Sequence, residues 1–117
     1  MRNAMEKIFK LEEVYKKEIK NIEQMEEVLD AMRTDARRKT DAWIDQLLYY
    51  SRNHSTDEIY PTLNEMQDNM DQFDVSIRKH FDTLSEEREE VTAKYRKDLG
   101  RLEEEYYKRK KAEDSQL

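Results

Sequence analysis

Apolar residues recur every seven positions along the first half of the chain. Counting from the first residue, every seventh position is apolar or aromatic: Met1, Ile8, Tyr15, Ile22, Leu29, Ala36, Trp43 and Tyr50. A second set lies three or four residues from the first: Met5, Leu11, Ile19, Met25, Met32 and Leu47. Neither Gly nor Pro interrupts the pattern. Such a repeat is typical of a helix that packs on another helix, so the sequence predicts one helix over about residues 3–52.

A second apolar pattern fills the other half of the chain. It contains Leu63, Met66, Met70, Phe73, Ile77, Phe81, Leu84, Val91, Tyr95, Leu99, Leu102 and Tyr106. Arg88 interrupts this seam, and the spacing slips by one residue between Val91 and Leu99, as a local stutter produces. Gly100 marks either a close approach by another backbone or a weak point of the helix, and we favour the weak point. The second helix is expected to end at about residue 113, followed by a frayed tail over about 114–117.

A polar segment separates the two patterns and predicts a loop over about residues 53–60. Ser55 followed by Glu58 matches a capping box, which starts the second helix at about residue 57 and leaves Pro61 to kink its first turns. Alternatively, Pro61 is the first helical residue. Both starts remain open from the sequence.

Two helices of similar length joined by a short loop predict an antiparallel hairpin. The expected fold is therefore all-α, a single coiled-coil-like helical hairpin over residues 1–117. The apolar positions face one another if the numbers of opposed residues add up to about 113, which places Met70 opposite Trp43. Charges agree with this orientation: residues 57–74 contain six acids and no base, and they face the basic residues of the stretch 33–39.

The composition excludes several other classes of protein. Charged residues make up 43% of the chain, and a single Gly and a single Pro cannot supply the turns of a sheet domain. Without Cys there is no disulfide, thiolate nucleophile or sulfur-ligated zinc. The net charge of −6 is unlike that of a nucleic-acid-binding protein. No long apolar run or signal peptide is present, which predicts a cytoplasmic protein and leaves export together with a partner open.

Candidate catalytic and metal-binding residues are few. His54 and Glu58 are spaced to share a helix face, but two ligands are too few for a metal site. His80 lies at the margin of the seam, where we expect a structural histidine bonded to a facing carboxylate. The chain contains no Gly-rich phosphate loop and no nucleophile–base arrangement. We therefore expect no enzyme, no cofactor and no metal.

Some apolar residues are not used by the predicted seam, and a helix that is apolar on more than one face is buried on more than one face. We expect these residues to bind a partner, either another helical protein or a second copy of the chain: Ile44, Leu48 and Tyr49 near the loop, and Phe9, Val14 and Tyr107 near the chain ends. The basic run of residues 108–111 is either a contact with an anionic membrane or the cationic last turn of a helix, and we favour the last turn.

The tryptophan near the bend, Trp43, and the charged stretches of residues 84–90 and 102–106 resemble the small helical hairpins of bacterial type VII secretion. The chain is most similar to the helical partner proteins encoded beside LXG toxins. It departs from the WXG pattern because Trp43 is followed by Ile44 and Asp45, and its C-terminal tail lacks the usual export signal of an aromatic residue followed four positions later by an acid. The resemblance implies a protein that escorts a toxin by binding its helical N-terminal domain, often alongside a second small helical protein.

Two classes of function follow. The favoured one is a non-catalytic helical adaptor or chaperone, of which a targeting factor for a secreted LXG toxin is the specific form. The alternative is a structural coiled coil that associates with itself as a homodimeric four-helix bundle.

Overall fold

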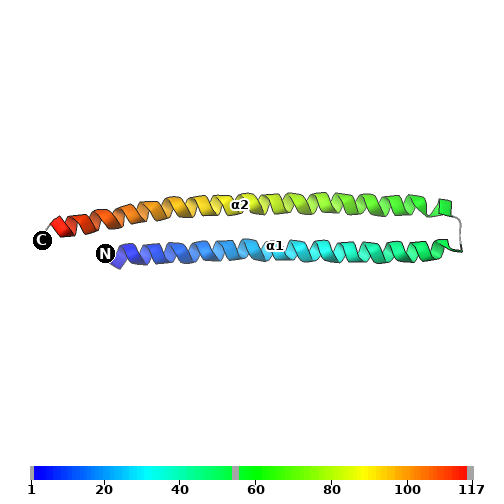
Figure 1. Cartoon of the computed structure of the whole chain (residues 1–117), viewed down its shortest axis with the longest axis horizontal. Coiled ribbons are helices and arrows are strands. Elements are labelled where there is room, and N and C mark those ends of the chain that lie inside the picture. Colours follow the sequence, from blue (N-terminus) through cyan, green and yellow to red (C-terminus); the bar gives the residue numbers. More distant parts are fainter. Residues whose placement is uncertain (1, 54–55, 116–117) are drawn as a thin grey trace. The chain divides into compact units, whose positions relative to one another are not determined.

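The computed structural model describes residues 2–53 and 56–115, and two long helices make up almost all of them (Figure 1). Helix α1 is Arg2–Ser51 and helix α2 is Tyr60–Ser115, with a short 3-10 helix, η1, at Thr56–Glu58. The described part of the chain contains no strand. The predicted all-α fold of two long antiparallel helices is thereby confirmed.

Contacts divide the hairpin into two compact units, each of which joins a part of α1 to a part of α2. Unit 1 combines Met1–Gln24 with Leu84–Leu117, and unit 2 is the continuous stretch Met25–Thr83 that includes the turn.

In unit 1, an aromatic pair holds the two helices together. The rings of Tyr15 and Tyr95 stack with their centroids 4.2 Å apart and an interplanar angle of 10°. The Tyr15 hydroxyl is also within hydrogen-bonding distance, 3.2 Å, of the Thr92 hydroxyl. Arg88, which interrupts the apolar pattern, is half-buried and places Nη1 4.0 Å from Oε1 of Glu23. An arginine is tolerated in the seam because its apolar stem packs while its charged end reaches a carboxylate.

Unit 2 has its buried side chains along the line where α1 meets α2. Leu29, Ile59 and Ile77 are all less than 8% exposed. The Thr40 hydroxyl donates a hydrogen bond to Sδ of Met70 over 3.7 Å, which fixes the register of the two helices in this unit.

The register agrees with the predicted one to within about one helical turn. Met70 was expected opposite Trp43; it contacts Thr40, which lies earlier in α1, and lines one groove together with Trp43. Ile59 was predicted to lie in the loop, but it is only 4% exposed, so that apolar packing begins at the turn itself rather than at Leu63.

The seam also rotates along α1, and five of its predicted members are exposed. These are Met5, Met25, Met32, Trp43 and Tyr50. Buried or half-buried positions that replace them include Ala4, Thr40, Ile44 and Ser51. In a straight helix, residues spaced seven apart shift around the helix axis by about 20° per repeat. A series that faces α2 at Ile8 therefore points about 120° away from that direction at Tyr50.

Helix α2 begins at Tyr60, which makes Pro61 its second residue. Proline is well tolerated there because the first amide groups of a helix have no intrahelical acceptor. The observed start is one residue from the second of the two predicted starts. The first prediction, a capping box at Ser55, falls on a residue outside the described part of the chain.

At its other end, α2 continues through Ser115, whose hydroxyl donates to the carbonyl of Lys111 over 2.8 Å. Residues 114 and 115 of the predicted frayed tail are therefore helical, and residues 116 and 117 lie outside the described part. The last turn contains no basic residue, so the interpretation of residues 108–111 as a cationic last turn is wrong.

Gly100 lies within α2, where a side chain would meet open space. A Cβ atom built on it has no heavy atom within 4 Å, and its φ is not positive. Of the two interpretations of this glycine, the structure favours a weak point in the helix over a close approach by another backbone. We expect Gly100→Ala to raise the free energy of unfolding by about 1 kcal/mol, because alanine favours the helix more than glycine. Urea denaturation followed by circular dichroism measures this gain, and a loss of stability would show that another backbone approaches Gly100.

Candidate functional site

The candidate site is the set of apolar side chains that the hairpin leaves exposed. Of the six residues predicted to bind a partner, five are exposed, with Tyr49 at 69%, Tyr107 at 66% and Phe9 at 62%. Leu48 and Val14 are about half exposed, whereas Ile44 is half-buried. Phe9, Val14 and Tyr107 belong to unit 1, and the other three belong to unit 2.

In unit 1, Val14 borders a small groove between α1 and α2. The groove has a volume of about 90 Å³, and its apolar lining consists of Leu11, Val14, Tyr15, Val91 and Tyr95. Charged residues from both helices border it as well, namely Glu18, Lys94 and Asp98. An apolar side chain of a partner could enter such a groove while charges at its edge set the orientation.

In unit 2, two different grooves flank the contact between α1 and α2. The first, which we call the apolar groove, has a volume of about 220 Å³ and is lined by Ala36, Thr40, Trp43, Met66, Asn69, Met70 and Phe73. None of these side chains is charged. Aromatic and methionine side chains are enriched at the centres of protein interfaces, and methionine adapts to partners of different shape.

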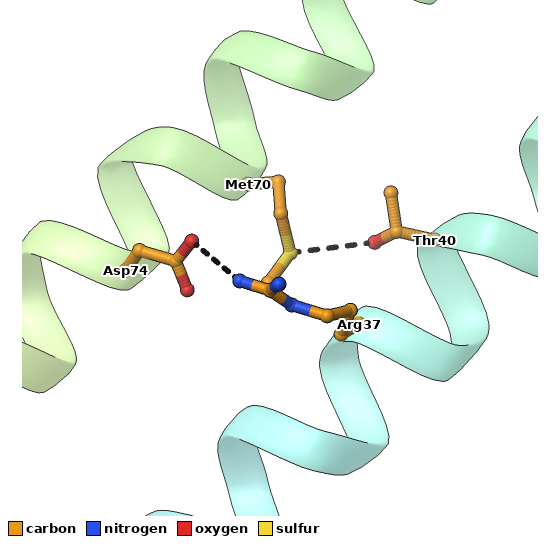
Figure 2. A network of polar contacts seen from close by, with 4 residues as sticks. All are labelled: Arg37, Thr40, Met70 and Asp74. Atoms are coloured by element: carbon orange, nitrogen blue, oxygen red, sulfur yellow. Dashed lines mark hydrogen bonds and ion pairs between the residues drawn. The ribbon is translucent and has the colours of Figure 1, made fainter.

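The second groove of unit 2 is charged, and we call it the charged groove. Its lining consists of Arg37, Thr40, Asp41, Ile44, Gln67, Met70, Asp71 and Asp74. Figure 2 shows its central contacts: Nη2 of Arg37 lies 3.2 Å from Oδ2 of Asp74, next to the Thr40–Met70 hydrogen bond. The predicted juxtaposition of the basic stretch with Asp74 is therefore confirmed. Because Thr40 and Met70 line both grooves, their contact separates the apolar groove from the charged one.

Five exposed side chains of α1 were missed as candidate site residues because they had been assigned to the seam, and four of them follow Gln24. These four form what we call the α1 stripe: Met25, Met32, Trp43 and Tyr50, which are between 48% and 56% exposed. The signal that identifies them is the difference between the seven-residue repeat and the 3.6-residue turn of a straight helix. All four lie in unit 2.

In the part of the chain that the structure describes, the candidate metal-binding side chains do not come together in one site. Residues 2–53 and 56–115 contain no group of three or more His, Asp or Glu side chains arranged to hold a metal ion. His54 lies outside these residues, and His80 is exposed. Within the same residues, neither long helix has a stretch apolar enough to cross a bilayer.

The Arg37–Asp74 pair should stabilise the hairpin modestly. Asp74 is half-buried, and its Oδ1 atom is buried without a hydrogen-bond partner. Arg37→Met would remove the partner of Oδ2 as well, and we expect it to lower the free energy of unfolding by about 1 kcal/mol, since a partly exposed pair is screened by solvent. Arg38→Met is a matched control because it removes a neighbouring charge of the same helix. Equal stabilities of the two variants in urea denaturation would show that the contact with Asp74 contributes nothing.

Comparisons with models of protein families, with curated proteins and with solved structures give no match for this chain.

Proposed function

We propose that the chain is a non-catalytic helical adaptor, which binds a helical protein partner through the apolar side chains that its own hairpin leaves exposed. The observation that carries this proposal is the exposure of large apolar residues in both units, including Phe9 and Tyr107 in unit 1 and Leu48 and Tyr49 in unit 2. Single exposed apolar residues are ordinary on a protein surface, but grouped ones indicate a binding surface.

Leu48 and Tyr49 form such a group in the last turns of α1, near the turn of the hairpin. Leu48 and Tyr49 point about 100° apart around the helix, so a partner helix laid against this end of α1 would cover one of them and border the other. Helices bind grooves and helix faces through apolar anchors spaced three or four residues apart, and two long helices offer such faces along their length.

The resemblance to proteins encoded beside LXG toxins supplies a specific partner for this proposal. In that case the partner is the helical N-terminal domain of the toxin, and the adaptor escorts the toxin to its secretion apparatus. The exposed aromatic residues and the two-helix architecture support this reading.

Leu48→Glu tests the proposal. We expect this substitution to weaken binding to the N-terminal domain of an LXG toxin from the same genome by at least 100-fold, because it places a charge in an apolar contact. Binding is measured by isothermal titration calorimetry with the purified proteins, and circular dichroism checks that the helix content is retained.

Val75→Glu is the matched control, because Val75 is 49% exposed and Leu48 is 47% exposed, and both belong to unit 2. The control should bind as the wild type does. Equal affinities of the Leu48→Glu variant and the wild type would contradict the proposed surface, and loss of helix content in that variant would show that Leu48 belongs to the seam.

A further inference from the structure

The four residues of the α1 stripe lie on one face of α1. Met25, Met32, Trp43 and Tyr50 are separated by seven, eleven and seven residues. Seven and eleven residues are close to two and three complete turns of an α-helix, so successive members differ in direction by only about 20°. The stripe covers about 38 Å of the helix at 1.5 Å per residue.

The intervals of the α1 stripe read the same in both directions. Its midpoint lies between Arg37 and Arg38, with a methionine pair on one side and an aromatic pair at the same distances on the other. If a second copy of α1 lies antiparallel on the stripe, Met32 meets the partner's Trp43 and Met25 meets the partner's Tyr50. Thioether sulfur packs favourably against aromatic rings, so each contact joins complementary side chains. We propose that a second copy of this chain covers the α1 stripe through this two-fold symmetric contact, which makes the protein a homodimer with a four-helix bundle at unit 2.

Charges around the midpoint are compatible with this pairing. On the α1 stripe side, Lys39 is paired with Asp35 in the same helix at 3.1 Å. In the antiparallel arrangement Lys39 lies opposite the partner's Ala36, which brings it close to the partner's Asp35, so that opposite charges meet across the two-fold axis.

The two arginines at the midpoint do not oppose the contact. Arg37 is paired with Asp74 at the charged groove, and Arg38 lines a different surface of α1 together with Arg37 and Asp41. Ala36, which lines the apolar groove, is small enough to let the two copies of α1 approach closely near the axis.

The exposed area is large enough to accommodate a second copy. The chain exposes 9744 Å², whereas a compact monomer of 14.3 kDa exposes about 6,800 Å². The difference of roughly 2,900 Å² per chain is large enough to supply an obligate homodimer interface, which buries about 2,000–5,000 Å² in total. A dimer formed through the α1 stripe leaves Tyr49, Phe9 and Tyr107 outside the contact, so it goes beyond the proposed adaptor function and does not depend on it.

Molar mass of the purified chain, measured by sedimentation equilibrium, tests the dimer. We expect twice the mass of one chain, and we expect Met32→Glu and Trp43→Glu each to raise the dimer dissociation constant at least 100-fold, because each substitution places a charge in the interface twice. Tyr49→Glu is the control: Tyr49 is the most exposed of the large apolar residues given above for α1, and it is not in the stripe. The control variant should remain dimeric.

Disulfide formation tests the pairing of Met32 with the partner's Trp43. The chain has no native cysteine that could form a competing disulfide. A mixture of the Met32→Cys and Trp43→Cys variants should form covalent dimers on oxidation, whereas neither variant should cross-link alone. A monomeric wild type, a dimer unaffected by both glutamate substitutions, or a Met32→Cys variant that cross-links to itself would each overturn the inference. A monomer that still binds the toxin domain would overturn only this inference, and a dimer that does not bind it would overturn only the adaptor function.

Discussion

Replacing Ile59 by alanine is expected to lower the free energy of unfolding by about 2–4 kcal/mol, which is one of the two largest effects that we predict. Ile59 is 4% exposed and lies between η1 and α2, and its carbonyl accepts a hydrogen bond from the amide of Leu63 over 3.0 Å. The substitution removes the apolar contact that closes the turn end of unit 2 and leaves a cavity there. Urea denaturation followed by circular dichroism measures the loss.

Tyr60→Ala is the control for this experiment. Tyr60 is the neighbouring residue but is 58% exposed, so its removal should change stability by less than about 0.5 kcal/mol. If both variants were equally stable, Ile59 would not be part of the core.

Tyr15→Ala is expected to have an effect of similar size in unit 1, a loss of about 3 kcal/mol. It removes the stacked ring against Tyr95 and the polar contact with Thr92 in one step. A double-mutant cycle with Tyr95→Ala should give a coupling energy of about 1 kcal/mol, the typical value for a stacked aromatic pair.

Tyr107→Ala serves as the matched control, because Tyr107 is 66% exposed and contacts the ring of Tyr106 only at its edge. Its substitution should leave stability within about 0.5 kcal/mol of the wild type. A coupling energy of zero between Tyr15 and Tyr95 would show that the two rings do not stack in solution.

The two helices and their antiparallel order could be predicted because they depend on features visible in the sequence. Apolar positions at helical spacing, with neither Gly nor Pro before residue 61, define α1. A polar break in the middle of the chain defines the turn. The ion pair of Arg37 with Asp74 also followed from the distribution of charge along the two halves.

The burial of Ile59 could not be predicted, because it depends on where the first apolar contact after the turn is made. Ile59 follows polar residues and precedes Pro61, so its neighbours in the sequence indicate a loop, while its burial results from tertiary packing.

The residues of the candidate site were predicted only in part for a related reason. Tyr49, Phe9 and Tyr107 fall outside any helical seam and are exposed. Trp43 and Tyr50 fit a seven-residue repeat and were assigned to the seam, although a helix with 3.6 residues per turn carries them toward the edge of the seam, where they are about half exposed. Only the twist of the helices in three dimensions shows which repeat the packing follows.

The most direct test of the hairpin is an intramolecular disulfide between the two helices of unit 2. Thr40 and Met70 are in contact, and the chain has no other cysteine to compete. We expect the double variant Thr40→Cys/Met70→Cys to form a disulfide within one chain on mild oxidation at low protein concentration, seen by mass spectrometry of the cross-linked peptide. Disulfides that form only between different chains would show that α1 and α2 of one chain do not pack on each other and would contradict the account.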